Sequence, residues 1–112
     1  MIVFQFPSSP ASRSWPIIGG HIVSAFIGVF VSNLISDRML ASGLAVGISL
    51  LAMHLLRCMH PPGGGTALVA VIGGSTVHDA GYQFVLCPTF VNATILAAMA
   101  AVYARLIKVK SD

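Results

Sequence analysis

Charged side chains are scarce in this sequence. Only 8% of its 112 residues are charged and 56% are hydrophobic, whereas a soluble domain usually carries about a quarter charged residues. A soluble domain of this length buries only roughly two-thirds of the surface of its unfolded chain, which is too little for so many apolar side chains. The scarcity therefore excludes an ordinary soluble fold and indicates a protein whose main partner is the lipid bilayer.

Carboxylates are scarcer still. The chain has no glutamate, and its three aspartates, Asp37, Asp79 and Asp112, are scattered. The paired carboxylates of acid–base catalysis are thus missing, and no pair of nucleophile and base is evident. We expect no enzymatic activity and no cofactor. The two cysteines, Cys58 and Cys87, form no Cys-x-x-Cys motif and indicate neither a disulfide nor a redox compartment.

The basic residues lie near the ends of apolar stretches, at Arg13, Arg38, Arg57, Arg105, Lys108 and Lys110. A nucleic-acid-binding protein would gather them on one face, so we expect no nucleic-acid partner. Basic side chains at such positions anchor helix ends among the lipid headgroups. They predict a multi-pass protein of the cell membrane, which in a bacterium is the inner membrane.

Three long stretches carry no charged residue: 16–36, 39–56 and 80–104. Each approaches or reaches the roughly 20 residues that cross the hydrocarbon core as a helix. We predict an all-α membrane protein, a single domain over residues 1–112, with transmembrane helices at about 17–36, 39–57 and 88–108. A further apolar run at about 66–73 is too short to cross and is predicted to be a half-helix or a re-entrant segment.

Small residues recur every four positions in each predicted helix. Such stripes let helices approach closely, which drives helix packing in lipid. They predict close packing between these helices, and self-association into a homo-oligomer. The stripes are Gly20, Ser24, Gly28 and Ser32 in the first helix, Ala41, Ala45 and Ser49 in the second, and Ala93, Ala97 and Ala101 in the third.

The orientation depends on the short apolar run. If the run enters and leaves on one side, the turn at 37–38 shares a side with the C-terminus. If it crosses together with its loop, Arg13 and Arg57 share a side with the C-terminal basic cluster instead. In either case the rule that basic residues gather inside places the C-terminus in the cytoplasm.

The centre of the chain is a His-Pro-Pro-Gly-Gly-Gly-Thr turn at residues 60–66. Its prolines end the preceding helix, and Thr66 is positioned to cap the short run that follows. We expect a cluster of free N–H groups at residues 63–66, an electropositive site for a small anion. Transporters hold substrates at such broken helices. The alternative is a plain interfacial turn that joins two helices.

Histidines add to this hypothesis. His60 adjoins the turn and can donate to an anion or carry a proton, or it can simply bond the last carbonyls of the preceding helix. His21 and His54 lie within or near predicted spans and are secondary candidates. The predicted substrate-binding residues are His60, Pro61, Pro62, Gly63, Gly64, Gly65 and Thr66.

The motif at 60–68, His-Pro-Pro-Gly-Gly-Gly-Thr-Ala-Leu, resembles the HPP family of small integral membrane proteins. A second match is Phe-Pro-Ser-Ser-Pro at 6–10, followed by Ile-Gly-Gly-His at 18–21. Family members typically have four transmembrane helices, and some resemble nitrite transporters. The resemblance implies transport of a small anion such as nitrite. It also implies a first helix, ending in a Pro-Phe-Gly-Ala turn, that is missing here, so the chain is expected to lack part of a composite site.

Two other functions remain open. One is a non-transporting membrane scaffold or subunit that assembles through the small-residue faces. The other is a membrane enzyme or metal protein that uses His54, Cys58 and His60. His54 and Cys58 are four residues apart and could begin a metal site, but further ligands are not evident, so we expect no bound metal.

Overall fold

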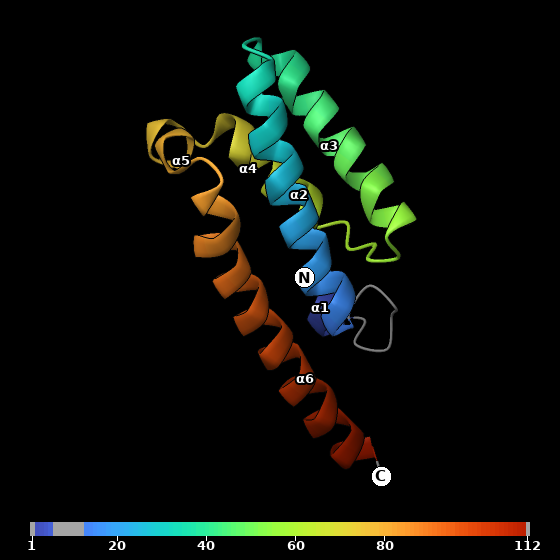
Figure 1. The fold of residues 1–112 in the computed structure, drawn as a ribbon. Helices are drawn as coiled ribbons and strands as arrows, with labels where there is room; N and C mark the ends of the chain where they lie inside the picture. The colour runs from blue at the N-terminus through green and yellow to red at the C-terminus, as the bar shows by residue number, and fades with distance from the viewer. Residues whose placement is uncertain (1, 6–12, 112) are drawn as a thin grey trace.

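The structure is a computed structural model that describes residues 2–5 and 13–111, with side chains for residues 4–5 and 13–108. The described part of the chain is a bundle of helices without strands, as Figure 1 shows. The main helices are α2 (Ser14–Leu34), α3 (Arg38–Leu55), α4 (Gly63–Ile72) and α6 (Val91–Ser111). Three shorter elements are α1 (Ile2–Gln5), α5 (Ser75–Ala80) and η2 (Val85–Phe90), a π-helical turn that leads into α6.

Three helical segments are long and apolar enough to cross a membrane: Ser14–Leu34, Arg38–Leu55 and Val85–Lys108. The predicted all-α membrane fold with three such helices and one shorter helix is confirmed. Some boundaries differ from the prediction. The first helix begins at Ser14, three residues before the predicted start. Pro16 does not prevent this, because a residue in the first helical turn needs no N–H for a helical hydrogen bond. Between the short run and the last predicted helix, the structure has a further short helix, α5.

Helices α2 and α3 form an antiparallel hairpin, as their short connection predicts. Asp37 precedes α3, and its Oδ1 accepts hydrogen bonds from the backbone N–H groups of Met39 at 3.0 Å and Leu40 at 3.2 Å. A side-chain oxygen in this position satisfies donors that the first helical turn leaves open. The cap fixes the point at which the chain reverses.

Replacing Asp37 by alanine should destabilise the hairpin by about 1 kcal/mol, because two N–H groups lose their acceptor. The measurement is thermal unfolding of the purified protein in detergent. Asp79→Ala is the matched control, since it removes the same charge from an exposed position that caps no helix. Equal melting temperatures for the two variants would show that the cap contributes nothing.

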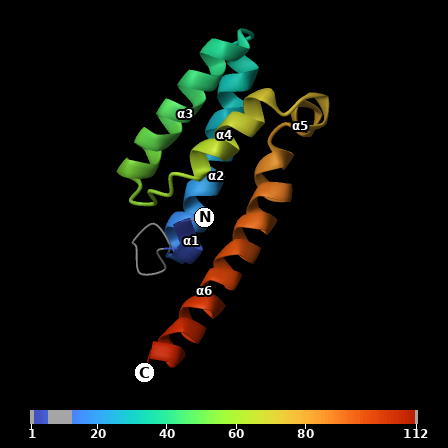
Figure 2. The same cartoon turned by 180° about the vertical axis from the view of Figure 1, so that it is seen from behind.

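The short helix α4 packs against both helices of the hairpin, parallel to α2 and antiparallel to α3 (Figures 1 and 2). The direction follows from contacts along α2. A Cβ on Gly20 would lie 2.9 Å from His60 Cβ, and one on Gly28 would lie 2.7 Å from the carbonyl oxygen of Ala67. Position 60 precedes α4 and position 67 lies within it, so both helices run the same way. Their small residues permit this close approach.

Helix α6 runs antiparallel to α2. Near the start of α2, Ile17 packs against Ala97 and Ala100 of α6. Further along α2, Val29 packs in one cluster with Phe84, which precedes α6 in sequence. The buried alanines of α6 are 93, 97 and 100. The predicted stripe of small residues at every fourth position is therefore wrong at Ala101, which is exposed. The 3.6-residue period of the helix places position 100 on the buried face instead.

The chain direction thus alternates through α2, α3, α4 and α6. The loop at 56–62 and α4 together return the chain to the end at which α2 finishes, and α6 runs back again (Figure 2). The re-entrant alternative is not what the structure shows. Arg13 before α2, Arg57 after α3, and Arg105 near the end of α6 share one end of the bundle, and Arg38 lies at the other.

Candidate functional site

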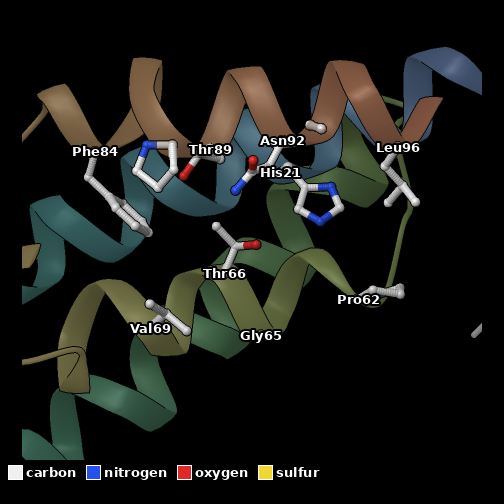
Figure 3. A pocket seen from close by; sticks show the side chains of 11 residues that line it. His21, Pro62, Gly65, Thr66, Val69, Phe84, Thr89, Asn92 and Leu96 are labelled. Atoms are coloured by element: carbon white, nitrogen blue, oxygen red, sulfur yellow. The ribbon is translucent and has the colours of Figure 1, made fainter. Parts of the chain in front are cut away.

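A cavity of about 490 Å³ lies between α4 and α6 and is closed on one side by α2. Figure 3 shows it from close by, with α6 on one side and α4 on the other. This volume is in the range of small-molecule sites. Its walls are His21, Pro62, Gly65, Thr66, Val69, Phe84, Pro88, Thr89, Asn92, Ala93 and Leu96.

Polar side chains from three elements meet in this cavity. His21 comes from α2, Thr66 from α4, and Thr89 and Asn92 from the start of the last span. In Figure 3 the amide of Asn92 points into the space between His21 and Thr66. Polar groups within a membrane span are costly and usually mark a pathway or a binding site. These four side chains are the groups of the candidate site that can form hydrogen bonds with a ligand.

Two interruptions of helical backbone border the cavity, which Pro62 and Pro88 help to line. One is the Pro61–Pro62 turn before α4. The other lies within η2, where Cys87 has extended backbone angles of φ −142° and ψ 122° just before Pro88. Irregular backbone at membrane depth is tolerated where it is buried in protein or lines a wet cavity. The arrangement matches the discontinuous helices at which transporters bind substrates.

The cavity lies beside the first half of α2, because His21 follows the start of that helix at Ser14 by seven residues. Two aromatic pairs connect the elements around it: Phe26 of α2 with Tyr82, 5.3 Å between ring centroids, and Phe4 of α1 with Tyr103 of α6, 5.1 Å.

His21 has one ring nitrogen already engaged. Its Nδ1 lies 2.7 Å from the carbonyl oxygen of Ile17, one turn back in α2. A carbonyl only accepts, so Nδ1 carries a hydrogen and donates it. The neutral ring then has Nε2 as an acceptor, and protonation turns Nε2 into a donor. His60 lies behind His21, fully buried, with 5.1 Å between the two ring centroids.

The expected cluster of free N–H groups in the central turn is wrong for its three glycines. The N–H of Gly63 donates to the carbonyl of His60 at 2.8 Å, that of Gly64 to Pro61 at 2.9 Å, and that of Gly65 to Pro62 at 3.1 Å. Pro62 already has helical backbone angles. The carbonyls of His60, Pro61 and Pro62 therefore accept hydrogen bonds from the glycines as the carbonyls of a preceding helical turn would. Thr66 caps nothing, because α4 begins three residues before it.

The residues of the turn separate into two groups. Gly63 and Gly64 are buried and serve packing: a Cβ on Gly63 would meet the carbonyl oxygen of Gly20 at 2.9 Å, and one on Gly64 would face α3. Pro61 is exposed and does not line the cavity. Pro62, Gly65 and Thr66 do line it. The structure brings His21 to these residues and places His60 one layer behind.

His54 lies elsewhere. It is exposed at the end of α3 and does not line the cavity. The four-residue spacing of His54 and Cys58 does not put them on one helix face, because α3 ends at Leu55 and Arg57, with φ +56°, turns the chain away. Burial raises the pKa of the Cys58 thiol, and a backbone hydrogen bond opposes this only in part. Among the described residues no three histidine, cysteine or aspartate side chains are placed to share a metal.

Sequence reasoning missed Thr89, Asn92 and Phe84 as parts of the site. A signal for two of them was present, since Thr89 and Asn92 are polar residues at the start of an otherwise apolar span. What could not be read from the sequence is that this span start faces His21, which lies far away along the chain. The second motif at residues 6–10 lies outside the described residues.

The fold and the cavity together define a class: a multi-pass helical membrane protein with a cavity at broken helices, in which four polar side chains lie among apolar ones. Comparison with known proteins agrees with this class. The family model described as "HPP, transmembrane region" matches residues 1–111, and the chain belongs to this family.

Two curated relatives are transmembrane proteins of Dictyostelium discoideum. One is 32% identical over 106 residues, which cover 91% of this chain and 37% of the relative. The other is 30% identical over 92 residues, which cover 79% of this chain and 29% of the relative. The chain thus spans about a third of the length of these relatives. No solved structure matches it.

Proposed function

We propose that this protein transports a small anion such as nitrite across the cell membrane, through the cavity between α2, α4 and α6. The observation that carries the proposal is the convergence of His21, Thr66, Thr89 and Asn92 in one cavity of the helical bundle. Hydroxyl and amide groups can donate hydrogen bonds to an anion, and a protonated histidine adds positive charge. Within the described part of the chain, no carboxylate lines the cavity to repel an anion.

The size of the cavity also supports a small substrate. About 490 Å³ holds a triatomic anion together with several waters. The end of the bundle that carries Arg13, Arg57 and Arg105 faces the cytoplasm in this proposal, in keeping with the rule that basic residues gather inside. We further propose that the chain is not an enzyme and that its role is carriage alone.

Nitrite uptake into proteoliposomes tests the proposal. Wild-type protein should accumulate nitrite faster than protein-free liposomes, and His21→Ala should lower the rate at least tenfold, because the cavity loses its ionisable group. His54→Ala is the matched control: the same change at an exposed position outside the cavity should leave uptake as in the wild type. Equal effects of the two histidine variants would contradict the assignment.

One observation favours the second candidate, a membrane subunit without transport activity. An apolar groove of about 380 Å³ runs along α6 between Phe4, Met99, Tyr103 and Leu106. Such a face suits a second copy of the chain as well as lipid. Crosslinking in membranes that captures a stable complex, with no anion flux in any assembly, would favour this role over transport.

A further inference from the structure

The ionisable groups around the cavity are few. Among the residues that the structure describes, His21 is the only titratable side chain in the lining, which otherwise consists of apolar residues, Thr66, Thr89 and Asn92. An anion that enters this space brings a charge that neutral hydrogen-bond donors can solvate but cannot cancel. Placing an unpaired charge at membrane depth is costly. A proton on His21 would supply the missing countercharge.

The geometry of His21 fixes where that proton binds. Nδ1 donates to the carbonyl of Ile17 at 2.7 Å, and a hydrogen remains there whether the ring is neutral or charged. The exchangeable site is therefore Nε2. When Nε2 is protonated it donates to an anion, and when it is neutral it does not. The same atom thus couples the charge of the cavity to its ability to bind an anion.

His60 limits the pair to one proton. Its ring is fully buried and 5.1 Å from that of His21. Two positive charges at this separation disfavour each other strongly inside a protein, so the pair holds a single added proton. The other titratable groups on the 56–62 loop are the Cys58 thiol, which is buried, and Arg57, which is exposed. The residues that α4 and α6 contribute to the described lining of the cavity carry no titratable side chain, and Thr66 and Asn92 are the polar ones among them.

We propose that the protein is a proton–anion symporter in which the His21–His60 pair carries one proton with each monovalent anion. This inference rests on the proposed transport function. A proton from water on one side bonds to His21 Nε2, and the anion binds beside it as counter-ion. On the other side the N–H bond breaks, and both ions leave to water. The net movement is one proton and one anion, which transfers no charge.

The test measures proton movement together with anion movement. Proteoliposomes that hold a pH-sensitive dye receive external nitrite, and potassium with valinomycin holds the membrane potential at chosen values. The expected result is internal acidification by one proton for each nitrite taken up, at a rate independent of the potential. Protein-free liposomes at each pH give the background from diffusion of nitrous acid, which is subtracted.

The pH dependence has a defined sign. Anion binding needs the protonated pair, so nitrite uptake should rise as the assay pH is lowered from about 8 to about 5. His21→Gln keeps a hydrogen-bonding side chain without a titratable group. Its nitrite exchange should be slower than that of the wild type, flat across this pH range, and without proton movement.

The outcomes separate the two proposals. Nitrite uptake that moves charge, follows the membrane potential and leaves internal pH unchanged overturns the symport while transport stands. A His21→Gln variant that still acidifies the liposomes one for one overturns the role of His21. Wild-type nitrite flux equal to that of protein-free liposomes overturns the transport function and the symport with it.

Discussion

Replacing Gly28 by leucine should destabilise the protein by about 3 kcal/mol or more. Gly28 lies at the contact between α2 and α4, and even a Cβ there would be 2.7 Å from the carbonyl oxygen of Ala67 and 2.7 Å from Ala70 Cβ. The first of these atoms belongs to helical backbone and cannot rotate away. Overpacking of a tight contact typically costs about 1–3 kcal/mol, and a backbone clash puts this site at the upper end or beyond.

Gly47→Leu is the matched control for this variant. Gly47 also lies within a membrane-spanning helix, but a Cβ there would have nothing within 4 Å, and the position is exposed. Melting temperature and elution as a single species in detergent are the measurements. A Gly28→Leu protein as stable as Gly47→Leu would mean that α4 does not pack on α2 as described. The cavity, of which α4 forms one side, would then have a different shape.

Features that depend on local sequence were predictable. The apolar lengths gave the three spanning helices, because helix length is set directly by bilayer thickness. The small-residue stripe of the first helix gave its packing face, since Gly20, Ser24 and Gly28 are all buried. These signals are read within one helix and need no knowledge of its neighbours.

Features that depend on tertiary arrangement could not be predicted from the sequence. The glycines of the central turn were expected to offer free N–H groups, yet the two preceding prolines already adopt the geometry that supplies acceptors to them. Proline fixes φ near the helical value. From the sequence, the two prolines were expected only to end the preceding helix. The glycine run then serves close packing at Gly63 rather than ligand contact there.

The meeting of His21 with Asn92 also could not be read from the sequence. It depends on α6 running antiparallel to α2 and on the backbone break at Cys87, which exposes the start of the span to the cavity. The sequence placed the site in the central turn, with His21 and His54 as secondary candidates. The structure distributes the site over three elements and keeps Thr66, Gly65 and Pro62 of the turn within it.

Replacing Asn92 by leucine should reduce nitrite uptake at least tenfold. In Figure 3 the Asn92 amide points into the centre of the cavity, where leucine would fill space and remove the hydrogen-bonding group. The fold should survive, because the side chain is exposed to the cavity and leucine is a better helix former than asparagine. The expected loss is therefore one of transport without loss of folded protein.

Nitrite uptake by Asn92→Leu beside Asn33→Leu is the most direct test of the claim that this cavity is the path of the anion. Asn33 is exposed near the end of α2 and does not line the cavity, so the control makes the same chemical change elsewhere. We expect wild-type uptake for Asn33→Leu and at least a tenfold loss for Asn92→Leu, with both proteins equally well folded. Wild-type uptake by Asn92→Leu would show that the anion does not pass through this cavity.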